Sequence, residues 1–184
     1  GWRLLLLAEQ ARLTGQGHRE LLAEADAVRH ALDAAATGVP PSYPEQYWPC
    51  DAVVAMAAVV RAHEAAHQPL HPVALADWRT KLNRLRDPAS GLLGHQIDVF
   101  GHVLEGPRGS SQAIIQAYWP DIDPQGAAEQ WQRFTGLFLV REWGLVGVRE
   151  HPIGTDAAGD VDSGPLIAGV SASASAVTLA AARR

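Results

Sequence analysis

The chain has 184 residues, of which 47% are hydrophobic and 19% are charged, with a formal net charge of −5. This composition is typical of a globular domain with a buried core and excludes a disordered chain. A negative charge without clusters of Lys and Arg argues against a nucleic-acid surface. The single cysteine, Cys50, excludes an internal disulfide.

Two helices are predicted near the N-terminus, at residues 2–14 and 18–36. Both segments carry apolar residues at three- and four-residue spacing. Gly15 and Gly17 break the first pattern, and Gly38, followed by two prolines, ends the second. We therefore expect a helical hairpin here.

A second pair of helices is predicted in the next forty residues. Asp51 begins the run AVVAMAAVV, which is apolar on every side and is typical of a helix buried all round. Pro69 and Pro72 separate this helix from an amphipathic one at about 73–86.

The remaining chain alternates loops and helices. PASGLLGHQIDVFGHVLEGPRGSS favours a small hairpin or an ordered loop. Helices are expected at about 110–118 and 124–142, followed by a short extended piece, LVGVREHPIG, and the loop TDAAGDVDSGP. The uncharged run 165–182 is nearly long enough to cross a bilayer, but its Ala, Ser and Gly content favours a closely packed buried helix. No alternation is sufficient for a sheet of any size.

These elements predict an all-α fold, an α/α toroid of helical hairpins that is incomplete in this chain. The chain begins at Gly1 rather than at a methionine, and TLAAARR contains no helix stop signal. We therefore expect a single toroid-like domain over residues 1–184 that is a fragment of a longer protein. In a toroid, the loops before the inner helices gather at one end, which would bring SYPEQYWPCD, GLLGHQIDVFGH, RGSSQ and GDVDSGP together.

The stretches YWPCDAVVAMAA, DPASGLLGHQID, RGSSQAIIQAYWPDIDP, AAEQWQRF, GVREHPIG and GDVDSGPLIAGVSASASAV resemble poorly characterised bacterial proteins related to linalool dehydratase-isomerase. The resemblance covers roughly residues 43–182. It implies an α/α toroid with a pocket on the loops before the inner helices. Some members of that group carry membrane helices, so it slightly favours an extracytoplasmic or membrane-associated location and leaves open a tether outside this chain. Tyr47 and Met56 stand where the linalool enzyme has cysteines.

The segment before the apolar helix supplies the first candidate site residues. An aspartate at a helix start accepts hydrogen bonds from free N–H groups, so Asp51 is either the N-cap or a pocket carboxylate. The neighbouring side chains would line a substrate pocket, and they are Tyr47, Trp48 and Cys50.

GHQID contains His95 and Asp98, the minimal pair for acid-base catalysis. Both could instead tie down a loop through backbone hydrogen bonds. Downstream, RGSSQ places polar side chains at a helix start, where they would hold an anion or a hydroxyl, or cap the helix; they are Arg108, Ser110, Ser111 and Gln112.

GDVDSGP has the alternate acidic spacing of a calcium loop but lacks the further ligands, including the glutamate at the twelfth position. We expect Asp162 or Ser163 to cap the last helix, with Pro165 in its first turn. Asp160 would then be a second catalytic carboxylate, and Asp162 is also a candidate for substrate binding. Weaker candidates nearby are Glu150 and His151.

HEAAH, residues 63–67, matches the zinc pattern in which two histidines one turn apart bind the metal and the glutamate activates water. Pro69 ends the helix within a turn of His67, so a third ligand from His71 would require a kinked loop. We interpret the motif as a helix end and keep a zinc hydrolase through His63, Glu64 and His67 as an alternative.

The sequence therefore predicts a small-molecule acid-base enzyme without a cofactor. It would be a lyase or isomerase of a hydroxylated or terpenoid-like substrate, or a carbohydrate-active enzyme. The catalytic residues would be His95, Asp98, Asp51 and Asp160. The first alternative is a non-catalytic binding or extracytoplasmic module of a membrane protein. For the protein as a whole, we expect a small-molecule substrate as the partner and do not expect nucleic acid. Whether it forms an oligomer is left open.

Overall fold

The computed structural model describes residues 1–142 and 144–183. The chain divides into two compact units. Unit 1 comprises Gly1–Leu85 with Ile97–His102, and unit 2 comprises Arg86–Gln96 with Val103–Arg184. The expectation of a single domain stays a prediction.

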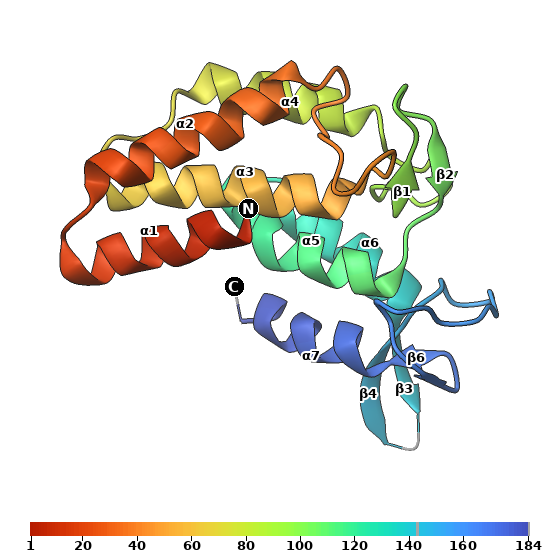
Figure 1. Cartoon of the computed structure of the whole chain (residues 1–184). Coiled ribbons are helices and arrows are strands. Elements are labelled where there is room, and N and C mark those ends of the chain that lie inside the picture. The colour runs from red at the N-terminus through yellow and green to blue at the C-terminus, as the bar shows by residue number, and fades with distance from the viewer. Residues whose placement is uncertain (143, 184) are drawn as a thin grey trace. The chain divides into compact units, whose positions relative to one another are not determined.

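Unit 1 is built from helices, and the central one is α3. Figure 1 shows α3 beside both α1 and α2, which it contacts along its length. Val53, Ala57 and Val59 of α3 are fully buried, which confirms the prediction of a helix with apolar residues on every side. The helices are α1 (Trp2–Thr14), α2 (His18–Ala34), α3 (Pro49–Ala65) and α4 (Pro72–Asn83).

Glycines set the turns of unit 1. Gly15 and Gly17 have φ of 66° and 77°, in the left-handed region that residues other than glycine rarely adopt. Gly15 N–H donates to Ala11 O over 2.8 Å and so ends α1. Gly38 (φ 77°) follows α2, and its carbonyl accepts a 2.8 Å hydrogen bond from the buried indole N–H of Trp78. These positions confirm the predicted breaks.

Unit 2 mixes helices with short strands. Its hydrophobic core joins helix and strand residues, among them Ala113, Phe134, Val148 and Ala174. The helices are α5 (Gly109–Ile122), α6 (Ala127–Phe138) and α7 (Ala172–Ala181). The strands are β3 (Leu139–Glu142), β4 (Leu145–Arg149), β5 (Leu166–Ile167) and β6 (Val170–Ser171). They form an antiparallel sheet in the order β3-β4-β6-β5. A separate two-stranded sheet of β1 (Gln96–Ile97) and β2 (Val103–Glu105) precedes α5.

The prediction of an all-α toroid is therefore wrong. The strands have two to five residues, which is too few for an alternation of apolar and polar residues to be recognised. Some of them also pair with strands that are distant in the sequence, as Val148 does with Ser171. The helix expected at 124–142 ends at Phe138, where the chain continues into the β3–β4 hairpin. Gly144 has φ of 80° and supplies the turn.

The last helix also begins later than predicted. Residues 166–171 form the β5–β6 hairpin, whose turn residues Ala168 and Gly169 have φ of 51° and 78°. Ser171 is the N-cap of α7, because its Oγ accepts the N–H of Ala174 at 3.2 Å. The prediction that Asp162 or Ser163 caps this helix, with Pro165 in its first turn, is wrong. Within the described residues, the helices are all too short or too polar to cross a bilayer.

Candidate functional site

A buried glutamate joins the end of β4 to the start of α5 in unit 2. Glu150 is fully buried, and its backbone O accepts the N–H of Gly109 at 2.8 Å. Its carboxylate accepts the N–H and the Oγ–H of Ser110, at 3.1 and 2.7 Å. The negative charge thus lies at the positive end of the helix dipole. Only glycine fits at position 109, where the start of α5 comes close to the backbone of β4, because a Cβ there would lie 1.9 Å from Arg149 O.

Arg108 links this glutamate to two further carboxylates. The side chain is 7% exposed, and its Nε donates to Glu150 Oε1 at 2.8 Å. Its Nη1 donates to Asp160 Oδ2 at 2.6 Å and to Glu105 Oε1 at 3.2 Å. Burial alone would lower the pKa of Arg108, but the three carboxylates outweigh it and raise that pKa. Arg108 therefore carries a permanent charge.

His95 lies beside this network and is 5% exposed. Ser111 Oγ–H donates to Arg108 O at 3.1 Å, so the same oxygen accepts from His95 Nδ1–H, also at 3.1 Å. This hydrogen bond leaves the lone pair of the neutral ring on Nε2, 3.9 Å from Glu105 Oε2. Burial, followed by the charge of Arg108, lowers the pKa of His95, so the ring is neutral at pH 7.

Asp160 and Asp162 complete the cluster. Asp160 Oδ1 accepts the N–H groups of Asp162 and Ser163 at 2.9 and 3.0 Å. Burial would raise the pKa of Asp160, but these hydrogen bonds and the charge of Arg108 lower it. One ring nitrogen of His95 and one carboxylate oxygen each of Asp160 and Asp162 lie within 4.8 Å of one another.

That spacing would fit a divalent cation, but the surroundings do not favour one. Both oxygens of Asp160 already accept hydrogen bonds, and one of them binds the guanidinium of Arg108. A second cation beside Asp160 would be repelled by Arg108. We therefore do not interpret the three side chains as a cation site.

Gln112 supports the loop that carries His95. It is fully buried on α5, and its Nε2 donates to Leu93 O at 2.8 Å. This bond holds the chain two residues before His95, so Gln112 acts on the candidate site through the backbone. Its predicted contact with substrate stays a prediction.

Asp98 has a different partner from the one predicted. Its Oδ2 accepts from His102 Nδ1 at 2.7 Å, and its Oδ1 accepts the N–H groups of Phe100 and His102. The hydrogen bond from His102 lowers the pKa of Asp98. Asp98 belongs to unit 1, and the carboxylate next to His95 in unit 2 is Glu105.

The candidates that precede α3 also lie in unit 1. Trp48 is the N-cap residue of α3, so the prediction of Asp51 as the cap is wrong, and Asp51 lies in the first turn. Asp51 lines a cavity of about 350 Å³. Tyr47 O accepts the N–H of Ile97 at 3.1 Å, and Cys50 is buried.

HEAAH does not form the helical arrangement of a zinc site. α3 ends at Ala65, and His67 follows it with φ of 54°, outside the helix. His63 Nδ1 donates to Gln68 O at 2.8 Å. His71 accepts the N–H of Val73 at 3.3 Å and is the N-cap of α4. The two histidines of the motif therefore do not share one helix face.

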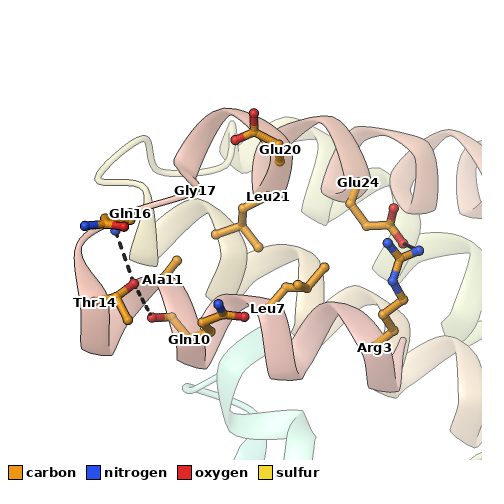
Figure 2. Close-up of a pocket in the computed structure, with 10 residues that line it drawn as sticks. All are labelled: Arg3, Leu7, Gln10, Ala11, Thr14, Gln16, Gly17, Glu20, Leu21 and Glu24. Carbon is orange, nitrogen blue, oxygen red and sulfur yellow. Dashed lines mark hydrogen bonds and ion pairs between the residues drawn. The ribbon is translucent and has the colours of Figure 1, made fainter.

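Unit 1 also has a surface cavity of about 450 Å³ between α1 and α2 (Figure 2). Arg3 and Glu24 form a 3.1 Å ion pair at its rim, and Thr14 Oγ1 donates to Gln10 O. These polar groups bind one another, and the cavity contains none of the predicted site residues. We therefore place the candidate site in unit 2.

No family model, curated protein or solved structure matches this chain. The resemblance to the linalool dehydratase-isomerase group thus stays an expectation. Unit 2 brings together His95, Arg108, Ser110, Ser111, Asp160 and Asp162 from the predicted set. Two glutamates that bind Arg108 stood outside the main predicted set, because Glu105 was not predicted and Glu150 was a weaker candidate. A glutamate three residues before Arg108 was the available signal for Glu105.

Proposed function

We propose that unit 2 carries the acid-base site of an enzyme that acts on a small hydroxylated molecule. The observation that supports this most is His95, a buried neutral imidazole whose Nδ1 proton is held by Ser111. Its other nitrogen lies on the side of Glu105. A neutral histidine of this kind is ready to accept a proton at pH 7.

In the proposed reaction, His95 Nε2 removes a proton from the substrate and becomes an imidazolium. Glu105, with its side chain 42% exposed, stabilises that cation from 3.9 Å. Asp162 is exposed next to His95 and Asp160 and would accept a hydrogen bond from a substrate hydroxyl. The proton then returns from Nε2 to the leaving oxygen or to another carbon, which gives a lyase or isomerase; a glycosidic oxygen would make the enzyme carbohydrate-active.

A non-catalytic binding module is the second candidate, and the Arg108 network favours it. A buried arginine held by three carboxylates fixes three chain segments without any chemistry. The two candidates differ in the role of His95, because only the enzyme requires this side chain to accept and release a proton.

The test is turnover of hydroxylated compounds in deuterium oxide by the wild type and by His95→Gln. Terpenoid alcohols and simple glycosides form the panel, and NMR detects products and deuterium incorporated into the substrate. We expect the variant to lose about 10²- to 10⁴-fold in rate. His30→Gln, on the exposed face of α2, is the matched control and should keep full activity. Equal rates in His95→Gln and the wild type, or no turnover of any class, would favour the binding module.

A further inference from the structure

A cavity in unit 2 lies away from the His95 cluster. It has a volume of about 400 Å³ and is lined by residues of α5, α6 and α7 together with Pro124 and Ala182. Its walls are prolines, alanines and Trp131, with Gln116 as a polar lining residue. Gln116 is seven residues beyond Gly109 on α5, about 10 Å along the helix axis. The cavity is thus separate from the groups around Arg108 at the start of α5.

Gln116 is buried there with an unused hydrogen-bonding group. The residue is 4% exposed, and within the described chain its Nε2 has no hydrogen-bond acceptor. A buried amide without a partner is costly and therefore calls for an explanation. A ligand in the cavity would supply one.

Pro120 leaves a second group on the same residue without its regular partner. In an α-helix the carbonyl of residue 116 would accept the N–H of residue 120, and proline has no N–H. Pro120 itself lines the cavity. Gln116 therefore combines an unused donor on its side chain with a carbonyl that lacks the regular helical donor, beside an otherwise apolar space.

We propose that this cavity binds a small apolar alcohol, with its hydroxyl at Gln116 and its hydrocarbon part against Trp131. A hydroxyl both donates and accepts, so one group can accept from Gln116 Nε2 and donate to Gln116 O. The alanines and prolines leave room for a ring or a short branched chain, and a cavity of this volume is within the range of small-molecule sites. This site is independent of the chemistry proposed for His95.

The experiment is an NMR titration with benzyl alcohol, and toluene serves as the probe without a hydroxyl. Benzyl alcohol should shift the side-chain amide signals of Gln116 and the indole signal of Trp131 saturably, with an affinity about tenfold higher than that of toluene. Gln116→Leu should remove the preference for the alcohol and keep the binding of toluene. The absence of saturable shifts at these two residues overturns the proposal, as does a preference that survives in Gln116→Leu.

Two further variants keep the test decisive if Gln116→Leu fails to fold. Pro120→Ala restores the N–H that the Gln116 carbonyl accepts in a regular helix, so it should weaken benzyl alcohol and leave toluene unchanged. Ala128→Trp fills the cavity and should prevent both probes from binding. If both variants bind benzyl alcohol as the wild type does, the site is not this cavity.

Discussion

The first turns of α3 in unit 1 and α5 in unit 2 show how differently two buried helices are anchored. Both follow an extended N-cap residue, Trp48 or Arg108. Along α3 the buried side chains are apolar, and Asp51 of its own first turn supplies the negative charge near its N-terminus. At α5 that charge comes from Glu150, 40 residues from Ser110.

The two helices also differ in the kinds of side chain that they bury. Both helices are buried, but α5 buries Ser110, Ser111, Gln112 and Gln116, whereas α3 buries residues such as Val53 and Val59. Most buried polar groups in proteins are satisfied by hydrogen-bond partners, and an unsatisfied one calls for an explanation such as a ligand. The polar content of the buried helix, rather than its burial, is therefore the reason why the candidate site is placed at α5 in unit 2.

The largest expected effect comes from removing the distant anchor of α5. Glu150→Leu keeps most of the volume but leaves Arg108 Nε and both donors of Ser110 without their acceptor. We expect a loss of about 3–5 kcal/mol in the free energy of unfolding, measured by urea denaturation. Glu129→Leu, which removes a surface ion pair with Arg133, should leave the midpoint unchanged. A loss for Glu150→Leu as small as that of the control would show that α5 is anchored locally, as α3 is.

A smaller effect is expected at the turns of unit 1, where anchoring is local. Gly15→Ala forces a side chain into the left-handed region in open space and should cost about 1–2 kcal/mol. Gly38→Ala adds a Cβ 3.1 Å from the buried ring of Trp78, which should raise the cost to roughly 3 kcal/mol. Thermal unfolding of the two variants gives the difference. Equal losses would mean that Trp78 moves aside at no cost.

The same contrast explains what the sequence could predict. The bounds of α1 and α2 follow from local signals, and the glycines at 15, 17 and 38, which were predicted to break the helices, take left-handed conformations. The strands of unit 2 could not be predicted in this way. Val148 and Ser171 become strand residues by pairing with each other, although they are far apart in the sequence. Tertiary pairing overrides weak local preference in such short segments.

The candidate site was only partly predictable for the same reason. The polar residues of RGSSQ and GDVDSGP could be recognised by their types, and Arg108 contacts Asp160 as an ion pair. The partner of His95 could not, because Asp98 is three residues away in sequence but binds His102 within its own hairpin. Glu150 was only a weaker candidate, since its contacts depend on Gly109 and Ser110 lying opposite the end of β4.

Two glutamines of α5 offer a finer comparison within one helix. Gln112 Nε2 donates to Leu93 O, whereas Gln116 Nε2 is buried without an acceptor among the described residues. Gln112→Leu should therefore lower the free energy of unfolding by about 1–2 kcal/mol, because Leu93 O loses its donor. Gln116→Leu should raise it by about 1 kcal/mol in the absence of ligand. Urea denaturation of both variants gives the signs, and losses in both would show that Gln116 has a structural partner.

The smallest expected effect is the pH dependence contributed by His95. Because burial and Arg108 lower its pKa below the ordinary value near 6.5, the unfolded chain binds a proton more readily than the folded one. The contribution of His95 is fully present above about pH 6.5 and is lost as the pH falls toward the lowered pKa. Asp160, with a lowered carboxyl pKa, acts in a separate window below its ordinary value. Urea midpoints between about pH 5 and about 7.5 should fall less steeply with acid in His95→Gln than in the wild type and in His30→Gln. An unchanged slope in His95→Gln would mean that this imidazole is free to protonate in the folded protein, and the acid-base site would then lack its neutral base.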